Sequence, residues 1–128
     1  MPTGLIFMKY DERSGMEIKA KYPEENLEIS DKTLMHILNL HEFSEEAGLV
    51  SLTLDNVNFV TYYTGSANDF FIILKLNILE EPEDYEVILE EISQTILKNL
   101  DKDKYLEILP SLFNRIREYP KKKNNLIE

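Results

Sequence analysis

Two runs of this chain are apolar at every position, and neither alternates. They are Leu5-Ile6-Phe7-Met8 near the start and Phe70-Phe71-Ile72-Ile73-Leu74 past the middle. A strand with one face in water alternates apolar and polar residues, whereas a strand covered on both faces is apolar throughout. We therefore predict two central strands of one sheet, with helices packed on each face.

Two further segments alternate, which is typical of edge strands with one exposed face. In residues 16–22, Met16, Ile18, Ala20 and Tyr22 are expected on one face, with Glu17, Lys19 and Lys21 on the other. These lysines would protect that edge from pairing with other chains. Residues 49–54 alternate without any lysine, and Asp55-Asn56 predicts a two-residue turn into a returning strand over residues 57–63.

Three segments predict helices. Ser30 is a good capping residue for a helix that would end near Phe43. Pro82 and the acids around it mark the start of a second helix, whose apolar stripe runs to Leu100. A last helix is expected from Leu106 onward, with a kink or restart at Pro110 and an end at Pro120. Residues 120–128 are then predicted to be a polar, disordered tail.

The predicted order of elements is β-β-α-β-β-β-α-α. It describes an α/β (α+β) fold, a three-layer α/β/α sandwich around a five-stranded, mostly antiparallel sheet. With 128 residues and no linker, the chain is expected to form a single domain over residues 1–119. The two apolar runs are the expected central strands, and residues 16–22 and 49–54 are the expected edges.

The charge of the chain limits its partners. Asp and Glu total 24 against 14 Lys and Arg, which gives a net charge of −10. A surface this acidic repels nucleic acids and anionic membranes. No apolar stretch reaches the length of a membrane span, and the N-terminus lacks a secretion signal. With no cysteine in the chain, these features predict a cytoplasmic protein that contacts membranes only through a complex.

Residues suited to catalysis are few. His36 and His41 are the only histidines, and their spacing of five places them on different faces of a helix, unlike metal-binding pairs four apart. The carboxylates of residues 80–84 and 90–91 are expected on solvated surfaces. Gly65-Ser66-Ala67 precedes a strand rather than a helix, unlike a phosphate-binding loop. We therefore predict no enzymatic activity, no cofactor and no metal site.

The unguarded edge strand is the best candidate for an interaction surface. It carries Ser51 and Thr53 where the other edge carries lysines, and free edges are templates for a strand from another protein. The alternative is a short edge strand without a partner. Together with the exposed side of the first helix, it gives a predicted interface of Met35, Asn39, Glu42, Leu49, Ser51, Thr53 and Asp55.

The order of elements and the burial pattern resemble the longin domain, a profilin-like fold of trafficking proteins. The matching parts are Gly4-Leu5-Ile6-Phe7-Met8 as first strand, the helix at 30–43, the hairpin at 49–63, the strand at 70–79 and two C-terminal helices. The resemblance implies a non-enzymatic module, a homodimer or heterodimer joined through the first helix and third strand. Its implied partners are small GTPases, trafficking or adaptor complexes, and other longin or roadblock proteins. The composition is similar to that of free-standing longin-like proteins of archaea.

A second class of function fits the same topology. A sensor domain of profilin-like or PAS-like topology binds a small molecule between the sheet and its helices, and therefore needs a cavity there. The apolar residues of this chain are large and numerous enough to fill such a space, which favours the interaction module.

Overall fold

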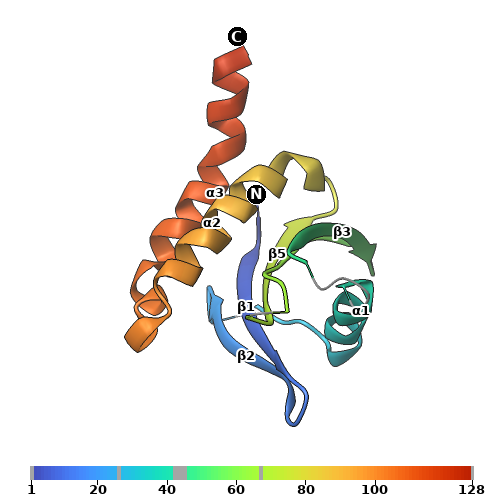
Figure 1. Cartoon of the computed structure of the whole chain (residues 1–128). Helices are drawn as coiled ribbons and strands as arrows, with labels where there is room; N and C mark the ends of the chain where they lie inside the picture. Colours follow the sequence, from blue (N-terminus) through green and yellow to red (C-terminus); the bar gives the residue numbers. More distant parts are fainter. Residues whose placement is uncertain (1, 26, 42–45, 67, 128) are drawn as a thin grey trace.

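Five antiparallel strands form one sheet in the computed structural model, which describes residues 2–25, 27–41, 46–66 and 68–127. The strands are β1 (Gly4–Asp11), β2 (Gly15–Tyr22), β3 (Gly48–Leu54), β4 (Val57–Tyr63) and β5 (Phe70–Asn77). The helices of this part of the chain are α1 (Asp31–His41), α2 (Glu86–Lys98) and α3 (Tyr105–Ile127), with 3-10 turns at Pro82–Tyr85 and Asp101–Asp103 (Figure 1). The strand order is β2-β1-β5-β4-β3, so the prediction of β1 and β5 as central strands and β2 and β3 as edges is confirmed.

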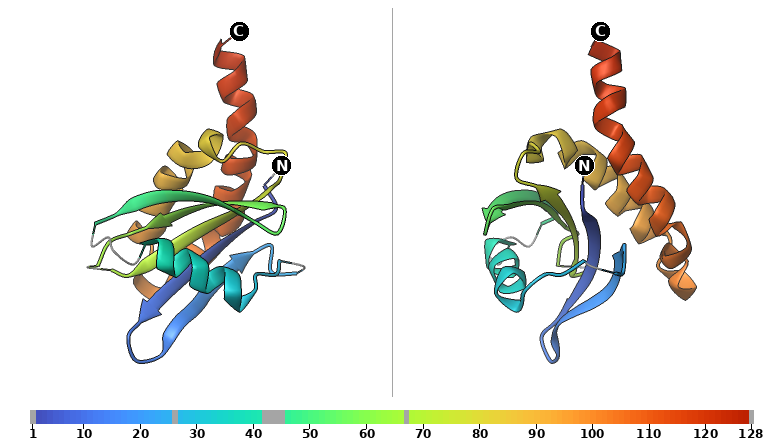
Figure 2. Two further views of the ribbon diagram at one scale, coloured as in Figure 1. Left: turned by 90° about the vertical axis from the view of Figure 1, so that its right-hand side faces the viewer. Right: turned by 180° about the vertical axis from the view of Figure 1, so that it is seen from behind.

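The unbroken apolar run of β1 is buried from both sides, as the absence of alternation predicts. Phe7 belongs to a buried cluster that includes Ile92 of α2 and Ile116 of α3. The next residue, Met8, belongs to a second cluster with Ile37 of α1. Figure 2 shows α1 against one face of the sheet and α2 with α3 against the other.

The adjacent tyrosines of β4 separate onto the two faces of the sheet, as expected from the alternation of a strand. Tyr62 lies in the cluster with α2 and α3, and Tyr63 lies in the cluster with α1. Both side chains are buried, and the Tyr63 ring stacks on Phe71 with ring centroids 4.8 Å apart. Both tyrosines are therefore core residues.

Strand β2 differs from the predicted alternation. Phe7 of β1 pairs with Ala20 and Met8 pairs with Ile18, so Lys19 is an extra residue, which makes a β-bulge. Because of the bulge, residues of β2 before and after Lys19 that are two or four positions apart point to opposite faces of the sheet. Met16 packs with the cluster around α1, whereas Ala20 packs with the cluster around α2 and α3. The prediction that residues 16, 18, 20 and 22 share one face is therefore wrong, because one inserted residue shifts a strand by half its period.

Local signals for the turn and the first helix are confirmed. Asp55 and Asn56 both have positive φ, 51° and 63°, as a tight hairpin turn requires. The Ser30 Oγ accepts a hydrogen bond from the Thr33 backbone N–H at 3.1 Å, which caps α1. The helix is described to His41, and the predicted end near Phe43 lies outside the described residues.

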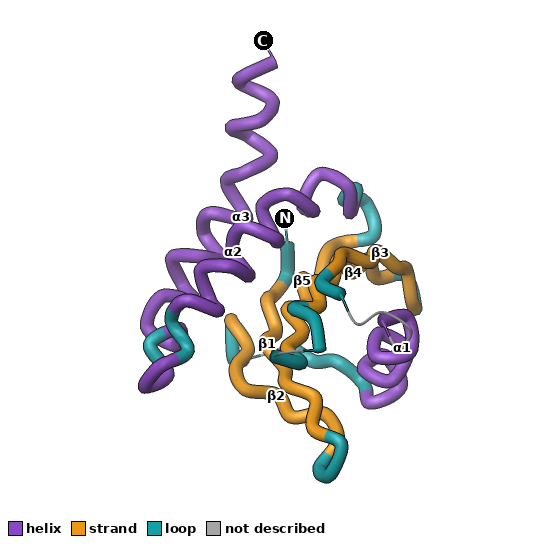
Figure 3. The backbone as a smooth tube through the Cα atoms, in the orientation of Figure 1, coloured by secondary structure: helices purple, strands orange, loops and turns teal. Residues whose placement is uncertain are grey.

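Helix α3 passes through both prolines that were expected to interrupt it. It is one helix from Tyr105 to Ile127, so the predicted restart at Pro110 and the predicted stop at Pro120 are wrong. A kink at Pro110 and the disorder of residues 120–128 stay predictions. A proline removes one N–H and crowds one carbonyl. At Pro110 that cost is small because Leu106, whose carbonyl is affected, is itself 49 % exposed rather than on the buried stripe. After Pro120, α3 projects beyond the rest of the molecule (Figure 3).

Candidate functional site

The two edges of the sheet differ in shape and in charge. At one end, β2 is bent by the bulge at Lys19 and carries Glu17, Lys19 and Lys21. At the other end, β3 pairs with β4 in unbroken register from Gly48 to Leu54, and no residue of this segment is charged. Bulges and charges block strand addition, and an edge without them lacks these obstacles. Of the two edges, β3 is the one without a bulge or a charged residue.

The hairpin turn decides which backbone groups of β3 are free. In a two-residue hairpin the flanking pair, here Leu54 and Val57, exchanges backbone hydrogen bonds, and bonded and non-bonded pairs then alternate along the ladder. Every second residue of β3 thus directs its N–H and C=O away from β4. These residues, whose outward groups we call the free edge, are Leu49, Ser51 and Thr53.

Side chains on the α2 face fix the backbone beside the free edge. Asn58 of β4 is 7 % exposed, and its Nδ2 donates to the carbonyls of Ile78 at 3.2 Å and Glu80 at 2.9 Å. Its Oδ1 lies against the hydroxyl of Thr53. One buried amide thus ties the turn after β5 to the outer strand.

Tyr85 also binds the turn after β5, through Glu80. Its hydroxyl donates to the Glu80 carboxylate at 2.6 Å. Burial, and then this hydrogen bond, raise the pKa of Tyr85, so its hydroxyl stays a donor at every physiological pH. Asn58 and Tyr85 thus both bind the turn after β5.

Ser51 lies at the centre of β3 and reaches α2. Its Oγ donates to the Glu86 Oε1 at 3.3 Å. Glu86 is the first residue of α2, where a negative charge suits the helix dipole. This contact places one carboxylate beside the middle of the free edge. Sequence reasoning missed it, because 35 positions separate the two residues and no local pattern joins them.

The predicted interface residues divide between the two faces of the sheet. Met35 and Asn39 of α1 line a hollow of about 350 Å³ together with Tyr10 and Asp69. No residue of β3 lines that hollow. The α2 face carries Ser51 and, packed against the buried cluster of α2 and α3, Leu49. Asp55 is exposed in the turn beyond Thr53, and Glu42 lies outside the described residues. The six described residues of the predicted interface thus form two groups instead of one patch.

The floor of that hollow is a buried aromatic group. His41 is 4 % exposed and its Nε2 lies 2.7 Å from the Thr61 Oγ1. Burial lowers the pKa of His41, so the ring is neutral at pH 7. The Tyr63 hydroxyl donates to the Asp69 carboxylate at 2.6 Å. These contacts satisfy the polar groups of the core, and His41 acts there as a structural residue.

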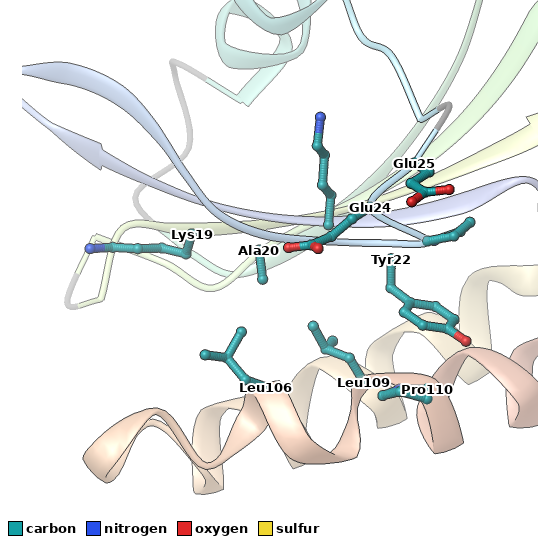
Figure 4. Close-up of a pocket in the computed structure, with 10 residues that line it drawn as sticks. Lys19, Ala20, Tyr22, Glu24, Glu25, Leu106, Leu109 and Pro110 are labelled. Atoms are coloured by element: carbon teal, nitrogen blue, oxygen red, sulfur yellow. The ribbon is translucent and has the colours of Figure 1, made fainter.

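A second hollow separates β2 from α3, as Figure 4 shows. Its volume is about 440 Å³, and its apolar lining comes from Ala20 and Tyr22 of the strand and Leu106 and Leu109 of the helix. Lys19 stands at its rim and pairs with Glu17 at 3.3 Å. This groove therefore combines an apolar lining with charges of both signs. Such a mixed lining does not indicate one class of ligand.

Two kinds of feature do not occur in the described part of the chain. No group of three or more histidine, aspartate or glutamate side chains is arranged to hold a metal ion there. None of the helices described is both long enough and apolar enough to cross a bilayer.

Comparisons with known proteins assign no family. None of the models of known protein families matches this chain, and a search of curated proteins finds no significant match.

Proposed function

We propose that this protein is a non-enzymatic interaction module with a three-layer, longin-like arrangement, and that it acts as a homodimer or heterodimer through the free edge of β3. The observation that carries the proposal is the contrast between the two sheet edges. Strand β2 is bulged and charged, whereas β3 pairs with β4 without a bulge and is uncharged over Gly48–Leu54. Main-chain hydrogen bonds from such an edge give affinity for an added strand.

The class of partner rests on the resemblance to longins. A small GTPase, a trafficking or adaptor complex, or another longin or roadblock protein would dock on the platform formed at β3. Because Met35 and Asn39 lie in the separate hollow beside α1, they form a second contact region in this proposal. The protein then works in the cytoplasm and meets membranes only through its complex.

The test uses a proline that removes one outward N–H and leaves the β3–β4 ladder intact. Ser51→Pro has this property because proline is tolerated in an edge strand where its missing N–H faces solvent. Ser51→Ala is the matched control, since it removes the hydroxyl and keeps the N–H. Mass by light scattering reports dimerisation, and a pull-down with nucleotide-loaded small GTPases of the same genome reports docking.

We expect the Ser51→Pro variant to lose its dimeric state or its binding to the partner. The Ser51→Ala variant should keep both. Circular dichroism of both variants should match the wild type. A folded Ser51→Pro variant that still binds as well as Ser51→Ala would contradict the use of β3, and capture of no GTPase in either nucleotide state would contradict that class of partner.

A small-molecule sensor is the second candidate, and one observation favours it. The hollow beside α1 measures about 350 Å³ and offers Tyr10, Asn39 and Asp69 as polar groups beside Met35, a size within the range of ligand pockets. Native mass spectrometry of the purified protein tests it. A retained small molecule that is lost on Met35→Trp would favour the sensor, and bare protein would count against it.

A further inference from the structure

The α2 side of the free edge carries a single carboxylate at its centre. Glu86 accepts the hydrogen bond of Ser51, the middle residue of β3. No ion pair of Glu86 with a lysine or arginine occurs among the described residues. A strand added at β3 would bring its own side chains, on this face, next to that carboxylate.

Exposed apolar side chains lie on elements next to the same edge. Val87, which follows Glu86 in α2, is 57 % exposed, and Leu79, in the turn that Asn58 ties to β4, is 87 % exposed. Ile78 of that turn is 44 % exposed. The elements that adjoin β3 on this face therefore carry a carboxylate in contact with Ser51 and exposed apolar side chains.

We infer that the partner is an extended segment with a lysine or arginine opposite Ser51 and uncharged apolar residues two positions to either side. The spacing follows from the two-residue period of a strand, which puts every second side chain on the α2 face. The inference rests on the proposed strand addition at β3 and adds the charge of the partner.

A second copy of this chain fits the edge poorly. Two copies joined through β3 by a two-fold axis would present the same surface to each other. With the axis near Ser51, the middle residue of β3, both Glu86 carboxylates would approach it, and Gly48–Leu54 supplies no positive charge to separate them. Each copy also has a net charge of −10, and like charges on this scale repel at low salt. Of the homodimer and heterodimer proposed above, this inference therefore favours the heterodimer, with a basic strand from another protein.

The experiment compares two short peptides, TVTKTVT and TVTETVT, which differ only in the central charge. Each is titrated into the full-length protein at low salt, about 20 mM, and the amide signals of Leu49, Ser51 and Thr53 are followed by NMR. We expect the lysine peptide to shift these amides and the glutamate peptide to bind more weakly. Opposite-charge pairs across strands predict a preference of about two- to fivefold, which Glu86→Gln should remove.

The controls separate the two proposals. A lysine peptide N-methylated on alternate residues leaves the protein intact and should not bind. If both charged peptides bind equally and the methylated one does not, strand addition stands and the preference for a basic partner is overturned. If no peptide shifts the free-edge amides, both proposals fail. If the wild type forms a dimer at low salt and Ser51→Pro dissociates it, the conclusion that a second copy fits β3 poorly is overturned.

Discussion

Asn58 offers the sharpest test of how the outer corner of the sheet is held. Its Nδ2 donates to two carbonyls, those of Ile78 and Glu80, and its Oδ1 contacts the Thr53 hydroxyl. The substitution Asn58→Asp keeps the shape of the side chain. It replaces the donor by a carboxylate oxygen that faces two carbonyl oxygens, in a site only 7 % exposed.

The expected loss of stability follows from counting these contacts. Two hydrogen bonds disappear, at about 1 kcal/mol each. The charge placed against two acceptors in a buried site adds at least about 1 kcal/mol more, so we expect the free energy of unfolding to fall by about 3 kcal/mol at pH 7. Asn58→Ala adds no charge but also loses the hydrogen bond from the Thr53 hydroxyl, so it should cost about 3 kcal/mol.

The sign of the pH dependence is a second check. The site disfavours a charged carboxyl, so the folded-state pKa of the introduced aspartate should lie above its unfolded value of about 3.9. The penalty is then smallest below that unfolded pKa and grows as the pH rises through the folded pKa. Urea unfolding of the variant and the wild type between about pH 4 and pH 7 measures the difference at each pH. A loss under about 0.5 kcal/mol, or one that does not change with pH, would refute the reasoning.

Three further predictions concern the core. Burial lowers the pKa of His41, so the stability of the wild type relative to His41→Gln should decline as the pH falls below 6.5, and a constant difference in urea unfolding would contradict this. A Cβ at Gly4 would lie 2.3 Å from the Leu27 Cδ1. Gly4→Ala should therefore cost about 1–3 kcal/mol, with a smaller additional loss in Leu27→Ala than in the wild type, and additive losses would contradict the contact. Tyr85→Phe removes the hydrogen bond to Glu80 and should cost about 1 kcal/mol in thermal unfolding, whereas an unchanged midpoint would show that the bond adds nothing.

The sequence predicts those parts of the fold that depend on local pattern. The unbroken run at Leu5–Met8 identifies a central strand, because burial on both faces removes the need for alternation. The pair Asp55-Asn56 identifies the turn, because both residue types accept positive φ. Ser30 identifies the start of α1 through a contact only three residues long.

The features that the sequence does not predict depend on contacts between distant segments. The bulge at Lys19 appears only when β2 is aligned with β1, since the residues of β2 alone alternate regularly. Pro110 is tolerated in α3 because Pro110 and Leu106, whose carbonyl loses its partner, are both exposed, which tertiary packing decides. The link between Ser51 and Glu86, on which the charge of the partner depends, joins two segments with no shared pattern.

Hydrogen exchange of the β3 amides tests the free edge most directly. In the dilute protein, the amides of Leu49, Ser51 and Thr53 should exchange fast, and those of Val50 and Leu52 slowly, because only the latter are bonded to β4. Adding the peptide TVTKTVT should slow the first three and leave the other two unchanged. Slow exchange of Leu49, Ser51 and Thr53 without any partner, or no change on adding the peptide, would contradict the account.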